Sequence, residues 1–238
     1  MLTKNIDKFA RENWQCERYY NTITKISDPG NGNSLVTSSQ KMFWFDHISD
    51  DLYTCQNNIP TSADGIIITE RVIYFVEFKS GFKKKITTKN FDEKKASCPY
   101  KNAICKDYWK LFFKKQNKET EQLIDSIRDK AIESYITLEK RLVPQFIDLD
   151  VSQKYRLVFV VVIDENEIEN MEATLGDLCS KDSISNNCFS DIRKSLQRCM
   201  NQKDVCGNDY YYDEVRVMST SDFVSFINNN CILIYSNP

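Results

Sequence analysis

Residues 62–79 read SADGIIITERVIYFVEFK, and they carry the sharpest structural signal in the chain. They hold two runs of β-branched and aromatic residues, 66–68 and 72–76, with only three residues between them. Such spacing is typical of a β-hairpin. The sequence therefore predicts two adjacent antiparallel strands at 64–68 and 72–79.

Charged side chains stand at the open end of this hairpin. If the strands fold back symmetrically about residues 70–71, Asp64 lies directly opposite Glu77. Side chains alternate across a strand, so Glu77 and Lys79 share one face while Phe78 points to the other. Two carboxylates in this register have Cβ atoms about 4.5–5.5 Å apart, with Lys79 on the diagonal.

These groups form a candidate metal site. Two carboxylates so close repel each other unless a cation lies between them, and Mg²⁺ prefers oxygen ligands while it keeps several waters. The backbone carbonyl of Phe78 can supply a third protein oxygen. We therefore expect Asp64, Glu77 and Phe78 to hold Mg²⁺, with Mn²⁺ as a substitute. Lys79 can orient or help to deprotonate the attacking water and offset negative charge in the transition state.

The elements around the hairpin predict an α/β sandwich in a single domain, residues 1–238. Apolar spacing and turn-forming residues indicate, in chain order, a helix at 2–20, strands at 42–47, 64–68 and 72–79, a helix at 120–143 that Pro144 stops, and a strand at 154–163. The last strand is an almost continuous apolar run, typical of a strand covered on both faces. In the tail that follows, 164–238, we expect helices and two short strands, Glu214–Met218 and Cys231–Tyr235.

Asp64, followed after twelve residues by Glu77-Phe78-Lys79 on adjacent apolar strands, resembles the motif of the PD-(D/E)xK nuclease superfamily, which has the restriction-endonuclease-like fold. The expected order of elements over about residues 1–163 is similar to the αβββαβ core of that family. The resemblance implies a sandwich with a central mixed β-sheet flanked by helices, and it leaves 164–238 as a mixed α/β C-terminal extension. The sequence departs from the family at Ala63, where a proline is expected.

The same resemblance assigns roles to residues. It implies that Asp64 and Glu77 are metal ligands and that Lys79 is the catalytic lysine. Many members of the superfamily add a glutamate from the first helix, for which Glu17 and Glu12 are the candidates. We prefer Glu17 as this additional ligand, because it continues the stripe of the helix that faces the sheet.

Positive charge gathers directly after the hairpin. The whole chain has a formal charge of −2, but residues 79–118 contain 13 Lys, no Arg and three acidic residues, a net charge of +10. Lysines suit a phosphate backbone, because each is a point charge on a long stem that displaces counterions without reading sequence. We therefore expect a Lys-rich insertion, about 80–118, to bind nucleic acid through Lys83, Lys84, Lys85 and Lys89. The alternative is a solvated insertion whose aromatic side chains pack onto the domain.

Other polar side chains carry weaker signals. Lys130 shares with Ser134 the helix face toward the sheet, where it can contact a phosphate of nucleic acid or remain solvated or salt-bridged. The single histidine, His47, excludes sites that need several histidines, and we expect it to pack or hydrogen-bond near the first strand. The nine cysteines are irregularly spaced and predict free thiols; the alternative is a zinc site built from Cys188, Cys199 and Cys206.

These features predict a Mg²⁺-dependent nuclease that hydrolyses phosphodiester bonds of DNA, and the resemblance suggests restriction or anti-phage defence. Two alternatives stay open: a catalytically silent protein of nuclease fold that binds nucleic acid or a partner protein, and a dimerising module built on residues 164–238. A homodimer is a further expectation. The N-terminus lacks the apolar core of a signal peptide, and the longest apolar run, Leu157–Ile163, is too short to span a bilayer. We therefore expect a cytoplasmic protein with no membrane partner.

Overall fold

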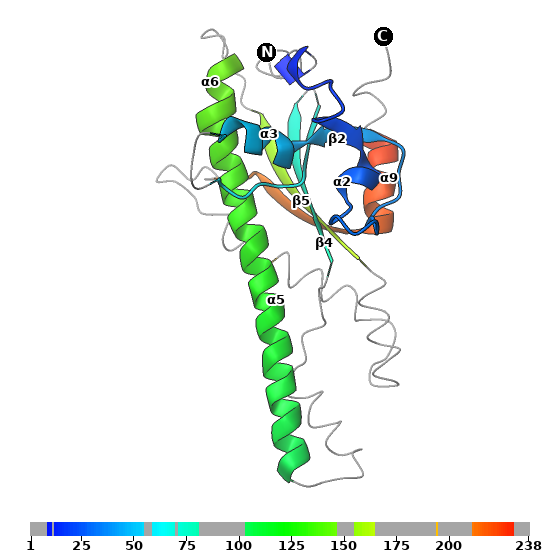
Figure 1. Ribbon diagram of the computed structural model, residues 1–238, viewed down its shortest axis with the longest axis vertical. Helices are drawn as coiled ribbons and strands as arrows, with labels where there is room; N and C mark the ends of the chain where they lie inside the picture. The colour runs from blue at the N-terminus through cyan, green and yellow to red at the C-terminus, as the bar shows by residue number, and fades with distance from the viewer. Residues whose placement is uncertain are drawn as a thin grey trace.

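The computed structural model describes residues 9–10, 12–54, 59–69, 71–80, 103–146, 155–164, 194 and 211–230. Over these residues the chain is an α/β protein with one open, six-stranded sheet (Figure 1). In both chain and spatial order, the strands are β1 Tyr20–Thr22, β2 Lys41–Trp44, β3 Gly65–Ile68, β4 Val72–Lys79, β5 Arg156–Ile163 and β6 Glu214–Ser219. Neighbours are antiparallel from β1 to β4 and parallel from β4 to β6, so the sheet is mixed, as predicted.

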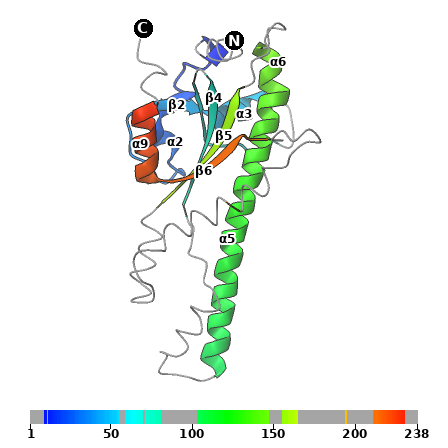
Figure 2. The same cartoon turned by 180° about the vertical axis from the view of Figure 1, so that it is seen from behind.

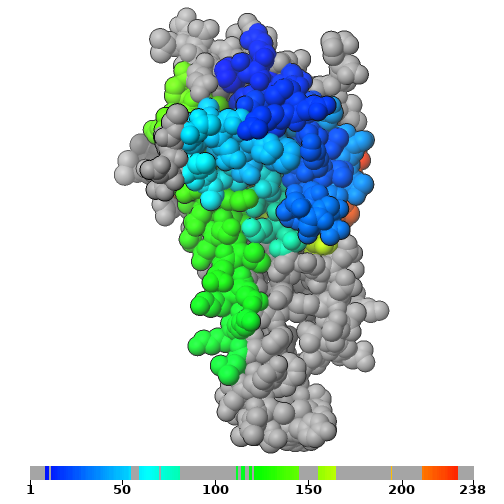
Figure 3. All heavy atoms as spheres, viewed as in Figure 1, coloured from blue at the N-terminus to red at the C-terminus, as the bar shows by residue number. Residues whose placement is uncertain are grey.

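Helices cover both faces of this sheet. They are α2 Ile23–Ile26, α3 Phe45–Leu52, α5 Ala103–Thr137, the π-helical turn η1 Leu138–Leu142, α6 Val143–Phe146 and α9 Thr220–Asn230. Figures 1 and 2 show α5 along one side of the sheet, with α2 and α9 on the other. The first half of α5 extends beyond the strands, and the helix forms part of the surface in the space-filling view (Figure 3). No helix in the described ranges is long and apolar enough to cross a membrane.

The hairpin forms in the register that its sequence predicts. Strand β3 pairs with β4 so that Ile66 lies opposite Phe75 and Ile68 lies opposite Ile73. After α5, the chain returns as β5, which pairs with β4 in parallel. From its second residue onward every side chain of β5 is buried, as expected for an apolar strand covered on both faces.

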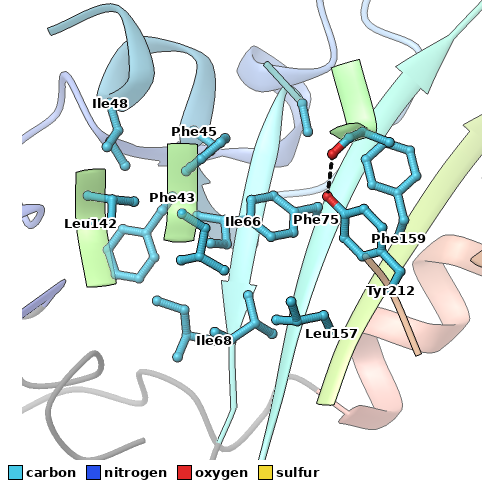
Figure 4. Packing of buried hydrophobic residues seen from close by; sticks show 14 of the residues in the cluster. Phe43, Phe45, Ile48, Ile66, Ile68, Phe75, Leu142, Leu157, Phe159 and Tyr212 are labelled. Carbon is cyan, nitrogen blue, oxygen red and sulfur yellow. Dashed lines mark hydrogen bonds between the residues drawn. The ribbon is translucent and has the colours of Figure 1, made fainter. Parts of the chain in front are cut away.

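Two apolar clusters lie on opposite faces of the sheet. On the face toward α5, Phe75 and Phe159 pack against the buried ring of Tyr212, together with Ile127 and Ala131 of the helix (Figure 4). Side chains from α2 and α9 close the opposite face. Because side chains alternate along a strand, this arrangement fixes which residues of β3 and β4 meet α5.

The predicted first helix, 2–20, is wrong at its C-terminal end. Helical residues reach only Asn13, whose side-chain amide donates to the carbonyl of Phe9. Trp14 then turns into the core, and Tyr20 lies opposite Phe43 as the first residue of β1. The edge of β2 therefore competes successfully with the helix for this part of the backbone.

The predicted strand at 42–47 is also wrong beyond Trp44. Phe45 donates its backbone N–H to the carbonyl of Asp64 and begins α3. The buried side chains of Phe45 and Ile48 are three residues apart and share one face of that helix. Asp46 in the first turn suits the positive end of the helix dipole.

The predicted helix at 120–143 is longer at both ends, and Pro144 does not stop it. Val143 donates its backbone N–H to the carbonyl of Leu138, so a π-helical turn precedes the proline. Pro144 consequently stands in the first turn of a new α-helical segment, α6, where its missing N–H is not needed.

Several predictions fall outside the described residues. They concern the strand Cys231–Tyr235, the lysines Lys83, Lys84, Lys85 and Lys89, and the cysteines Cys188, Cys199 and Cys206. Of the Lys-rich insertion, the part from Ala103 onward forms the start of α5. The predicted strand Glu214–Met218 is confirmed as part of β6.

Tyr212→Phe tests how the C-terminal strand is joined to α5. The fully buried Tyr212 hydroxyl donates to the carbonyl of Ala131 at 2.7 Å (Figure 4). Its removal is expected to lower the free energy of unfolding by about 1 kcal/mol and the melting temperature by roughly 2–4 °C, as measured by circular dichroism. An unchanged melting temperature would contradict this contribution.

Candidate active site

The hairpin register brings two carboxylates to the sheet face that α5 covers. Asp64 immediately precedes β3, and Glu77 lies in β4 one position beyond the last pair of the hairpin ladder, Gly65 and Val76. Asp64 is held by backbone on both sides. Its Oδ2 accepts the N–H of Phe78 at 2.7 Å, and its carbonyl accepts the N–H of Phe45 at 3.0 Å.

Lys130 of α5 bridges the two carboxylates. Its Nζ lies 3.1 Å from Asp64 Oδ1 and 2.9 Å from Glu77 Oε2. Lys79 lies on the other side of Glu77, with its Nζ 3.8 Å from Oε1 and 3.5 Å from the hydroxyl oxygen of Ser126. The structure thus brings together Asp64, Glu77 and Lys79, and it places Lys130 within the same cluster.

Glu133 and Ser134 of α5 also form hydrogen bonds with the segment that precedes Asp64. The carboxylate of Glu133 accepts hydrogen bonds from the backbone N–H and the hydroxyl of Thr61. The buried hydroxyl of Ser134 accepts the N–H of Ala63 at 2.8 Å. Lys130, Glu133 and Ser134 lie about one turn apart on α5. Glu133 and Ser134 fix the backbone before Asp64, and Lys130 fixes the Asp64 side chain.

Burial dominates the electrostatics of the cluster. The Glu77 side chain is only 1% exposed, and this burial, with repulsion from Asp64, raises its pKa to about 8 despite Lys130 and Lys79. Burial also raises the pKa of Asp64. Burial alone would lower the pKa of Lys130, but attraction to Asp64 and Glu77 outweighs it and the pKa is raised. The two lysines therefore offset only part of the cost of charging Glu77 in this buried place.

One carboxylate oxygen of the cluster is a candidate ligand for a cation other than the two lysines. Glu77 Oε1 is buried and has no hydrogen-bond partner in the described part of the chain. Within a strand the N–H and C=O of one residue point to the same neighbour, so the Phe78 carbonyl faces the side of Asp64. Two carboxylates and a carbonyl are the hard oxygen donors that Mg²⁺ takes, with waters completing the shell. The residues present therefore fit a divalent cation.

The expected third carboxylate does not join this site. Glu17 lies in an exposed turn before β1, because the helix that was to carry it ends at Asn13. Among the described residues, no three His, Cys, Asp or Glu side chains gather where they could hold a metal ion. The predicted helix is therefore wrong beyond Asn13, and among the described residues neither Glu17 nor Glu12 joins Asp64 and Glu77 in a group that could hold a metal ion.

His47 packs, as expected for it. Its ring stacks on Trp44 with 3.8 Å between ring centroids, and its Nδ1 lies 3.0 Å from the carbonyl oxygen of Arg18. The His47 ring is therefore held by its contacts with Trp44 and the Arg18 carbonyl.

The sequence predicts Lys130 on the helix face toward the sheet, with a salt bridge as one of its possible roles, but it does not predict the contact with both acids. Ser126, Lys130 and Ser134 recur at intervals of four, beside the buried positions Ile127 and Ala131 of the same helix. Polar side chains at helical spacing next to an apolar stripe indicate a polar contact at the edge of the core.

Comparison of the chain with protein-family models, with curated proteins and with solved structures finds no significant match in any of the three.

Ser134→Ala is expected to loosen the acidic pair. Without this hydroxyl, the buried N–H of Ala63 loses its acceptor, which destabilises the protein by about 1–3 kcal/mol. Ser126→Ala, eight residues earlier on the same helix, is a matched control, because its 3.5 Å contact with Lys79 is long and only partly buried. Urea denaturation measures both variants, and equal losses would contradict the special role of Ser134.

Proposed function

We propose that this protein is a metal-dependent nuclease that hydrolyses phosphodiester bonds of nucleic acid, DNA in the first place. The observation that carries the proposal is the buried carboxylate pair of Asp64 and Glu77, on adjacent strands, with two lysines within 4 Å. Mg²⁺ is the expected cofactor and Mn²⁺ its substitute. Proteins that the sequence motif resembles suggest restriction or anti-phage defence as the biological role.

The order of elements supports the same fold family. Strands β2, β3 and β4 form an antiparallel meander, α5 follows, and β5 returns parallel to β4. This is the order of the restriction-endonuclease-like core that the motif implies. Strand β6 and helix α9 extend it at the C-terminus.

Each residue of the cluster has a distinct task in this proposal. Asp64 and Glu77, with the carbonyl of Phe78, hold the cation, which when bound supplies Lewis-acid activation of water and of the phosphoryl group. Lys79 keeps a side chain that is 21% exposed next to Glu77, where it can orient the attacking water and offset charge that develops on the phosphate. The Phe78 N–H fixes the Asp64 carboxylate in advance, so that the ligand does not need to reorganise.

Positive charge near the site supports a nucleic acid as substrate. Residues 79–118, from the last residue of β4 onward, carry the net charge of +10, and the described C-terminal part of this segment leads along α5 toward Lys130. Lys114, Lys115 and Lys118 on this part of the helix are exposed. Exposed lysines on an element that leads to the site suit a polyanion whose backbone is followed without reading its sequence.

A cleavage assay tests the proposal. Purified protein is incubated with supercoiled and linear duplex DNA, single-stranded DNA and RNA, in Mg²⁺ and in EDTA. We expect cleavage only with metal, and a loss of roughly 100-fold or more in Asp64→Asn, Glu77→Gln and Lys79→Met. Lys140→Met, an exposed lysine of η1 outside the cluster, is the control and should retain activity. Absence of cleavage, or equal cleavage by Glu77→Gln, would contradict the proposal.

A second candidate is a protein of the same fold that binds nucleic acid or a partner protein without catalysis. The observation in its favour is that Lys130 gives both carboxylates a cation without any metal. For this candidate we expect DNA binding that is sensitive to salt, indifferent to Mg²⁺ and not followed by cleavage.

A further inference from the structure

Lys130 stands where a metal ion held by the pair would stand. Asp64 Oδ2 is engaged by the backbone of Phe78, so Asp64 Oδ1 is the oxygen that faces Glu77, and it is the one that Lys130 contacts. On Glu77 the ammonium contacts Oε2 at 2.9 Å. An ammonium and a divalent cation between the same carboxylates would repel each other strongly in this buried place. A divalent cation held by the pair would therefore favour the release of Lys130.

We propose that Lys130 exchanges partners during the reaction cycle. Lys130 bridges Asp64 and Glu77; if these carboxylates held a divalent cation, the released ammonium would bind a phosphate oxygen of the nucleic acid beside the site. This inference rests on the proposed function and adds a substrate-positioning residue to it. By linkage, metal and nucleic acid then bind cooperatively, since each favours the released lysine.

The surroundings of Lys130 permit this movement. Its side chain is 22% exposed and that of Asp64 is 20% exposed, so the bridge lies at the edge of the buried region. The residues one turn before and after it on α5 are the small Ser126 and Ser134. A lysine has a long flexible stem and a compact charge, and it can reach a new partner without a change in the helix.

A permanent structural bridge fits the geometry less well. A buried ion pair offsets its loss of hydration only when the remaining polar atoms are also satisfied. Here Glu77 Oε1 lacks a hydrogen bond among the described residues, and Lys79 stays 3.8 Å from it. The cluster is therefore incomplete with Lys130 alone, as expected for a resting arrangement that a stronger cation replaces.

The test measures DNA binding in EDTA, where neither metal nor cleavage contributes. Fluorescence anisotropy of a labelled DNA duplex is compared for the wild type, the double variant Asp64→Asn/Glu77→Gln, and the triple variant that adds Lys130→Met. The amides keep the shape of the acids but no longer hold the ammonium. We expect the double variant to bind about fivefold or more tightly than the wild type, and the triple variant to lose most of this gain.

Matched controls separate the release of Lys130 from a general loss of negative charge. Lys130→Met in the otherwise wild-type protein should weaken binding less than it does in the double variant, because in the wild type its ammonium is already engaged by the two acids. Lys140→Met should have the same small effect in both backgrounds. Thermal melts confirm that each variant is folded.

The outcomes also distinguish this inference from the proposed function. If the triple variant binds as tightly as the double variant, Lys130 is not the released cation and the inference is wrong, even where the wild type cleaves DNA in Mg²⁺. If no variant binds DNA and the wild type cleaves none of the substrates, the proposed function and the inference fall together.

Discussion

The ion pairs from Lys130 to Asp64 and Glu77 join the long helix to the central hairpin at one buried point. A carboxylate that is 1% exposed on an interior strand is destabilising unless cations and hydrogen bonds surround it. The structure supplies them from α5 and from β4 itself. Glu133 and Ser134 of α5 then hold the segment that precedes Asp64, so the helix that offsets the charge also sets the position of the second acid.

The place of this cluster in the sheet is consistent with a binding site. Strand β4 has an antiparallel neighbour on one side and a parallel neighbour on the other, and Glu77 and Lys79 lie toward its carboxyl end. In open α/β sheets, ligands commonly bind at the carboxyl ends of strands, where the connections diverge. Buried charge, two lysines and an oxygen without a hydrogen bond among the described residues together favour a cation and a phosphate there.

The hairpin and its register were predictable from sequence, because the apolar runs fix which faces are buried and a slip by one residue would expose them. The end of the first helix was not predictable from sequence. Tyr20 pairs with Phe43 at the edge of β2, and this edge exists only in the folded sheet. The misplacement of Glu17 on a helix follows from that. Lys130 could be placed on the inner face of its helix, but its contact with both acids depends on how deep the helix packs, which spacing alone does not fix.

We propose that Asp64 and Glu77 form a divalent metal site from which Lys130 is displaced. A crystal structure of the wild-type protein grown in Mn²⁺, with anomalous diffraction to locate the ion, tests it most directly. We expect a manganese peak within bonding distance of carboxylate oxygens of both residues, with the ammonium of Lys130 turned away. A structure at saturating Mn²⁺ in which Lys130 still bridges both acids and no manganese lies between them would contradict it.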